Sequence, residues 1–116
     1  MANEVVYTGR DNQAFYTDTT LDLNDNGAVC DELLEMGIYK TLSVGIEASP
    51  WTTARVELKF SLDGTTWYSM ASALILAGPG PCRREAVNGY RFMTLQTTTP
   101  EGGASIATVR WFVSTL

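Results

Sequence analysis

The chain has 116 residues, of which 45% are hydrophobic and 18% are charged, and its formal net charge is −5. This length fits a single domain that can bury its own core, and the composition excludes a disordered chain. The acidic balance argues against nucleic acid as a partner, because Lys and Arg side chains supply most of the affinity for phosphates.

The N-terminus lacks the basic stretch and apolar segment of a Sec signal peptide, and no apolar run approaches the length of a membrane span. We therefore expect synthesis in a cytoplasm and no membrane partner. A short β-prone piece followed by polar residues predicts an extended N-terminal segment, residues 1–13, ahead of a sandwich domain over residues 14–116. Val5 and Tyr7 of this segment are candidate contacts with a partner protein, since chain ends are disordered unless something holds them.

Strand signals recur along the rest of the chain. Residues 14–23 are rich in Thr, Phe and Tyr, and they lead through a polar turn to a possible short strand at 28–30 and a helical turn or loop at 31–37. Residues 41–48 and 54–61 alternate apolar and polar side chains, the pattern of a strand with one face in a core. Asp63 and Gly64 then signal a hairpin leading into a strand over 67–76.

A loop with two prolines and two glycines follows at residues 77–81, and two further strands are expected over 90–98 and 105–113. About eight short strands separated by regular turn signals are typical of a sandwich or barrel. We therefore predict an all-β fold, a single-domain antiparallel β-sandwich with minimal helix. A jelly-roll-like arrangement is expected, with an immunoglobulin-like one as the alternative.

The chain contains no histidine, which removes the most common general base and the most common transition-metal ligand. It also lacks a GxSxG motif, and without histidine the usual Ser-His or Cys-His activation of a nucleophile is impossible. Asp31, Glu32 and Glu35 lie close together, but their spacing does not identify an acid and a nucleophile. We expect no enzymatic activity and no cofactor.

Residues 22–27, Asp-Leu-Asn-Asp-Asn-Gly, match the opening of a calcium loop. The twelfth position, which needs a bidentate Glu, is Leu33, so we predict a polar turn and no metal site. Cys30 and Cys82 lie far apart and form no CxxC pair. They are expected to be free, partly buried thiols, with a disulfide formed after release from the cell as the alternative.

Aromatic side chains offer either a sugar-stacking surface or core packing. Trp111 lies on the apolar face of the last predicted strand, and Trp67 lies where a hairpin re-enters the sheet, which favours the core for both. Trp51 lies in a connection between two strands and is therefore a candidate protein-contact residue.

The last predicted strand is apolar on both faces near its end. Arg110 is the one charged residue in the sequence from 105 to 116, and Trp111 and Phe112 point to opposite faces. One face belongs to the core, and an edge strand with so few charges needs a partner. We therefore expect Phe112 to contact a second protein surface, most naturally a subunit of a homo-oligomer.

Within residues 56–68, Ser61, Asp63, Gly64 and Trp67 stand in the spacing S-x-D-G-x-x-W after an alternating strand. This segment resembles a recurrent signature of small bacteriophage virion proteins, and the pattern extends over residues 37–113. The resemblance implies a capsid decoration or cement protein that binds the outside of a phage head and stabilises it. It further implies a homo-oligomer, with a trimer favoured, whose partners are the major capsid protein or other virion proteins.

Two alternatives stay open. Discoidin-like and other carbohydrate-binding sandwiches share this spacing and a later aromatic-Arg strand, here Tyr90, Arg91 and Phe92, which implies a sugar-binding module. A tail or neck component of the same particle also fits. We favour the virion protein, made in the cytoplasm of a host bacterium, because a chain that starts at Met1 without a secretion signal has the form of a complete small protein.

Overall fold

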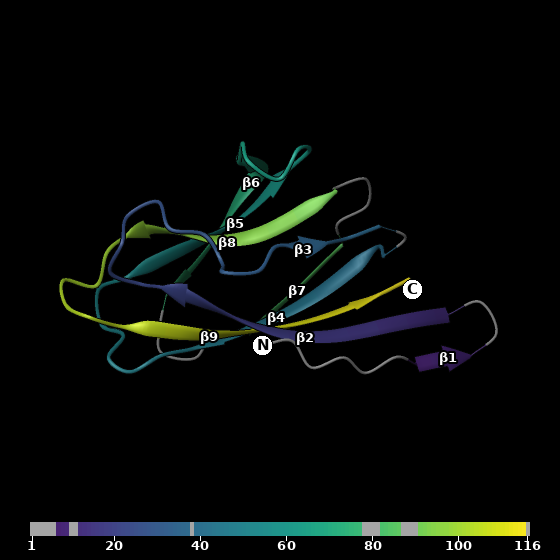
Figure 1. The fold of residues 1–116 in the computed structure, drawn as a ribbon, viewed down its shortest axis with the longest axis horizontal. Coiled ribbons are helices and arrows are strands. Elements are labelled where there is room, and N and C mark those ends of the chain that lie inside the picture. The colour runs from purple at the N-terminus through teal and green to yellow at the C-terminus, as the bar shows by residue number, and fades with distance from the viewer. Residues whose placement is uncertain (1–6, 10–11, 38, 78–81, 87–90, 116) are drawn as a thin grey trace.

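The structure is a computed structural model that describes residues 7–9, 12–37, 39–77, 82–86 and 91–115 (Figure 1). Its strands are β1 (Tyr7–Gly9), β2 (Asn12–Asp22), β3 (Leu34–Glu35), β4 (Thr41–Glu47), β5 (Arg55–Ser61), β6 (Tyr68–Ala77), β7 (Cys82–Ala86), β8 (Phe92–Thr99) and β9 (Ile106–Ser114). The described residues form no helix, and so none that could cross a membrane.

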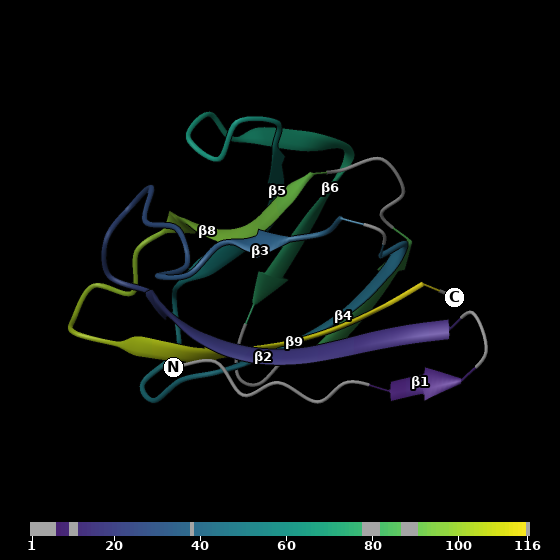
Figure 2. The same ribbon diagram turned by 45° about the vertical axis from the view of Figure 1, so that its right-hand side comes forward.

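The strands form two antiparallel sheets that pack face to face (Figure 2). One sheet has the order β1-β2-β9-β4-β7, and the other has the order β3-β8-β5-β6. The antiparallel pairs β2·β9, β3·β8, β4·β7 and β5·β6 are nested, as in one long hairpin that has been rolled up. This nesting makes the sandwich a jelly roll, so the predicted fold class is confirmed and the immunoglobulin-like alternative does not apply.

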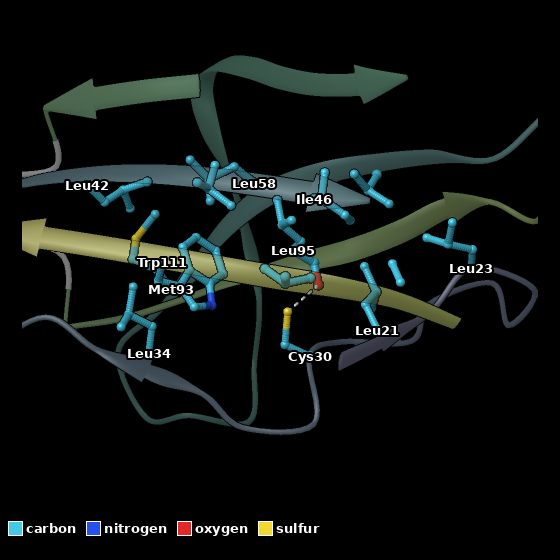
Figure 3. Packing of buried hydrophobic residues seen from close by; sticks show 14 of the residues in the cluster. Leu21, Leu23, Cys30, Leu34, Leu42, Ile46, Leu58, Met93, Leu95 and Trp111 are labelled. Atoms are coloured by element: carbon cyan, nitrogen blue, oxygen red, sulfur yellow. Dashed lines mark hydrogen bonds between the residues drawn. The ribbon is translucent and has the colours of Figure 1, made fainter. Parts of the chain in front are cut away.

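The core lies between the two sheets and follows the predicted alternation. In β4, Leu42, Val44 and Ile46 are at most 2% exposed, whereas Glu47 faces water. Trp111 of β9 is the largest fully buried side chain of the described residues, and Figure 3 shows it among apolar side chains from both sheets. Period-two burial is seen in β4 and β9 of one sheet, whereas β5 and β8 of the other sheet each have three consecutive buried residues.

The structure corrects the expectation that the last strand lies at an edge. β9 lies between β2 and β4, and it pairs with both along most of its length. Its backbone groups are therefore satisfied on both sides and need no partner. The orientation of Phe112 is nevertheless as predicted, because its side chain is 38% exposed while that of Trp111 is 1% exposed.

Two of the strands were not predicted. β3 occupies part of the segment expected to be a helical turn or loop, and β7 begins at Cys82, directly after residues 78–81, which lie outside the described residues. At the N-terminus, residues 7–9 of the predicted extension pair with residues 12–14 of β2 and form the end strand β1. The β1–β2 hairpin lies at one end of a molecule that measures 47 × 25 × 21 Å (Figure 1).

Candidate interaction surfaces

The outward side of β2, β9 and β4, which we call the β9 face, carries the exposed apolar residue predicted from the sequence. Phe112 lies opposite Tyr16 of β2 and Ser43 of β4 in the register. Ile106, at the other end of β9, is 61% exposed. The β9 face therefore presents apolar side chains at both ends of its central strand.

Charged side chains occupy the middle of the β9 face. The Arg110 guanidinium places Nη1 2.9 Å from Oε1 of Glu47 and Nε 3.9 Å from Oδ1 of Asp18. Asp18 raises the pKa of the neighbouring Tyr16 hydroxyl, chiefly through a side-chain hydrogen bond. Two acids and one base thus lie between the two apolar ends, and the centre of the face is slightly acidic.

Trp51 is buried rather than presented to a partner. Its side chain is 6% exposed and belongs to the hydrophobic cluster, and its Nε1 donates a 2.8 Å hydrogen bond to the carbonyl oxygen of Ala54. The contact role expected from its position between two strands does not fit this burial, because the β4–β5 connection folds back and inserts the ring into the core. Of the other candidate contacts, Tyr7 lies in β1, and Val5 lies outside the described residues.

A carboxylate from the β8–β9 connection fastens the loop that carries Trp51. Oε1 of Glu101 accepts hydrogen bonds from the backbone N–H groups of Thr52, Thr53 and Ala54 at 2.9–3.0 Å. Its Oε2 accepts a 2.7 Å hydrogen bond from Oγ1 of Thr52. These donors, first among them the N–H groups of Ala54 and Thr53, lower the pKa of Glu101 to about 2. Glu101 is therefore an ionised structural anchor and a poor proton donor.

The S-x-D-G-x-x-W segment forms a hydrogen-bonded loop between β5 and β6. Oδ1 of Asp63 accepts the backbone N–H groups of Thr65 and Thr66 and the hydroxyl of Ser61, each at 2.9 Å. The two backbone bonds, ahead of the Ser61 hydroxyl, hold the pKa of Asp63 far below its usual range. Gly64, with φ of +84°, allows the sharp turn.

Trp67, the last residue of this motif, is half-buried and lies outside the hydrophobic cluster. The predicted core packing is therefore confirmed for Trp111, whereas Trp67 is only partly buried. The long β5–β6 connection places Trp67 just before β6 begins at Tyr68, beyond the part of β5 that faces the core.

The residues of the calcium-like motif are engaged in turn hydrogen bonds. Oδ1 of Asp22 accepts the N–H of Asn24 at 2.8 Å, and Oδ1 of Asn24 accepts the N–H of Gly102 at 2.9 Å. Gly27 has a φ of +93°. In the part of the chain that the structure describes, no three His, Cys, Asp or Glu side chains are grouped to hold a metal ion.

The three acids that lie close together in the sequence do not all line the same surface. Asp31, Glu32 and Glu35 are all exposed. The backbone N–H of Asp31 donates to the carbonyl of Thr20, which ties this segment to β2. Glu32 and Glu35 line a cavity between β2 and β3, whereas Asp31 does not.

Cys30 is a free thiol, as expected, and it is 3% exposed. Burial raises the pKa of this thiol, so the reactive thiolate is suppressed. In a Cys82→Ser variant, we expect Ellman's reagent to modify Cys30 at least about 100-fold more slowly in the native protein than in denaturant. Equal rates in the two conditions would contradict the burial of this side chain.

No protein-family model and no curated protein matches the sequence. Among solved structures, the fold is similar to that of the SPBc2 prophage-derived protein YomS, with a TM-score of 0.58 and 12% sequence identity. That match covers 95% of this chain and 98% of the other. A CBM4 structure matches with a TM-score of 0.40 and 15% identity, over 93% of this chain and 74% of its own. The similarity to the prophage-derived protein shows a shared fold over nearly the full length of both chains.

Proposed function

We propose that the protein is a non-enzymatic structural protein of a bacteriophage virion, a capsid decoration or cement protein that binds the outer surface of the head. The observation that carries the proposal is the end-to-end fold similarity to a prophage-derived protein. The nested jelly-roll topology adds support, since jelly rolls are common in viral capsid domains. A tail or neck component is the alternative position in the same particle.

The chemistry of the β9 face supports binding to another protein. Interfaces combine apolar anchor residues with polar groups that set orientation, and here Phe112 and Ile106 flank the charged group around Arg110. Because the backbone of β9 is already paired on both sides, the contact is made by side chains and not by strand addition.

The environments of the carboxylates support a structural role for the chain. Glu101 and Asp63, whose pKa values are lowered, both accept several backbone N–H groups in connections between strands. Carboxylates used in this way stabilise loops, and they are held away from the protonated form that a general acid needs.

Quantitative mass spectrometry of purified particles tests the proposal. A decoration protein is expected in many copies per particle, in a fixed ratio to the major capsid protein, whereas a tail or neck component is expected in few. Analytical ultracentrifugation of the free protein tests the proposed homo-oligomer, for which we favour a trimer. Absence from purified particles would refute the proposed function.

Replacing Phe112 by Asp is expected to weaken binding to particles by at least about tenfold, because a charge then replaces an apolar anchor at the interface. The melting temperature should change little, since the side chain points away from the core. Co-sedimentation with particles measures the binding. Leu62→Asp is the matched control, because Leu62 is 59% exposed and lies in the β5–β6 loop. Wild-type binding by Phe112→Asp would show that Phe112 is not a contact residue, and unfolding of this variant would show that its side chain belongs to the core.

A further inference from the structure

A cavity of about 210 Å³ opens between β2 of one sheet and β3 of the other. We call it the β2–β3 cavity. Its lining residues come from three strands and one loop: Phe15, Thr17 and Thr19 of β2, Glu32 and Leu33 before β3, Leu34 and Glu35 of β3, and Trp111 of β9. Apolar surface from Phe15, Leu33, Leu34 and Trp111 therefore meets the hydroxyls of two threonines in one hollow.

The ends of this cavity are defined by contacts between the two sheets. At one end the backbone N–H of Glu32 donates a 2.9 Å hydrogen bond to Oγ1 of Thr19, which closes the gap between the strands. Towards the other end Phe15 stacks on Tyr39, with ring centroids 6.4 Å apart. The cavity thus runs along residues 15–19 of β2.

Trp111 lies at the inner end of the cavity and is 1% exposed. Its Nε1 is buried and has no hydrogen-bond partner among the described residues, whereas Nε1 of Trp51 is bonded to Ala54. In Figure 3 the indole nitrogen lies on the side of the ring that faces Leu34 and Cys30. Because this nitrogen has almost no accessible surface, a group in the cavity meets the apolar part of the indole ring.

The mouth of the cavity is acidic. Glu32 and Glu35 are exposed, and none of the described residues that line the cavity is basic. β3 is the end strand of its sheet in the described part of the chain. The N–H of Met36 donates to the carbonyl oxygen of Arg91, the residue before β8. Residues of an antiparallel pair alternate between hydrogen-bonded and non-hydrogen-bonded positions, so the backbone N–H and C=O of Glu35 point away from β8.

We propose that the β2–β3 cavity binds an extended segment of a partner protein that carries one anchoring side chain flanked by Lys or Arg. The anchor is a long apolar side chain, as Met has, and it fills the cavity towards Trp111. The basic residues pair with Glu32 and Glu35, and the backbone of the segment adds to the edge of β3 at Glu35. The inference rests on the proposed function in one respect, that the partner is another virion protein.

Nuclear magnetic resonance of the ¹⁵N-labelled protein tests the site without particles. The probe is the capped peptide Thr-Lys-Met-Lys-Thr, and its controls carry Glu in place of Lys or Ala in place of Met. We expect the Lys-Met-Lys peptide to shift the indole N–H signal of Trp111 and the backbone signals of residues 32–35. The indole signal of Trp51 should not move, because its N–H is bonded within the protein.

Charge-reversed variants make the test specific. Glu35→Lys should weaken the peptide at least about tenfold, while Asp25→Lys, a reversal at an exposed acid in the β2–β3 connection outside the cavity, should leave it unchanged. The proposal is overturned if the Lys-Met-Lys peptide moves no signal, if the Glu-Met-Glu or Lys-Ala-Lys peptide binds as well, or if the two variants behave alike.

A titration with free glucose and galactose separates a different class of ligand. A shift of the Trp111 indole signal with a sugar and not with the peptide would make the cavity a sugar site and overturn the proposal. The proposed function fails separately, through absence from purified particles. The peptide response of the purified protein would stand in that case, so the two failures are distinguishable.

Discussion

Replacing Leu58 by Ala is expected to lower the free energy of unfolding by about 3 kcal/mol, because it leaves a cavity in the middle of the sandwich. Leu58 is fully buried and lies in β5, which pairs with β8 on one side and β6 on the other. The β5–β6 register shifts directly after it, between Leu58 and Lys59. A side chain held between two neighbouring strands has little freedom to move and refill the space, which places the cost well above that of a surface truncation.

Leu62→Ala is the matched control for this substitution. Leu62 follows β5 in the same hairpin, but it is 59% exposed, so the same truncation should cost less than about 0.5 kcal/mol. Urea denaturation gives both values, and the dependence on denaturant should be the same for the two variants. Equal costs at the two positions would contradict the burial pattern of β5 and its place in the core.

The strands that were predictable from the sequence are those with one face in the core. The sequences of β4 and β5 alternate apolar and polar residues because every second side chain points into the core. These inward residues are Leu42, Val44 and Ile46 in β4 and Val56 and Leu58 in β5. β7 carries the sequence CRREA, without a run of alternating apolar residues, and β3 has two residues. Such strands form because a neighbouring strand offers its backbone, which no local pattern records.

The choice between a jelly roll and an immunoglobulin-like sandwich was not predictable in the same way. It depends on which strands pair, and the outermost nested pair joins Ala14 to Ser114 across almost the whole chain. Local alternation is the same in both arrangements, since each strand has one inward face. The topology therefore emerges from long-range pairing and not from any single segment.

Among the candidate contact residues, the orientation of Phe112 could be predicted from local alternation, whereas the burial of Trp51 could not. The outward orientation of Phe112 follows from its position next to Trp111 in an alternating strand, and the structure confirms it. The burial of Trp51 depends on how the β4–β5 connection folds, and that connection is held by Glu101, far away in the sequence. No spacing rule links a carboxylate between Pro100 and Gly102 to the N–H groups of residues 52–54.

The hydrogen bonds of Glu101 lead to an expected dependence of stability on pH. In the folded protein its pKa is lowered to about 2 from an ordinary value of 4.5. A carboxyl whose pKa is lowered by folding adds stability that is fully present above pH 4.5 and is lost as the pH falls towards 2. We therefore expect wild-type protein to lose part of its stability between pH 5 and pH 2 through this one group.

The variant Glu101→Gln isolates that contribution. At neutral pH it should lower the melting temperature by about 5–10 °C, because a neutral amide is a weaker acceptor for the three backbone N–H groups of residues 52–54 and places a donor beside them. As the pH falls from 5 to 2, the gap to wild type should narrow, since protonation makes the wild-type side chain neutral as well. Differential scanning calorimetry across this range measures both effects.

Glu35→Gln serves as the control, because the Glu35 side chain is exposed and lies at the mouth of the β2–β3 cavity, away from the β4–β5 connection. Its melting temperature should stay within about 1 °C of wild type at neutral pH, as for a typical surface substitution. The pKa of Asp63 is lowered as well, but this residue is present in all three proteins and its effect cancels in the comparison. A constant gap between wild type and Glu101→Gln from pH 5 to pH 2 would show that the charge of Glu101 does not hold the loop that buries Trp51.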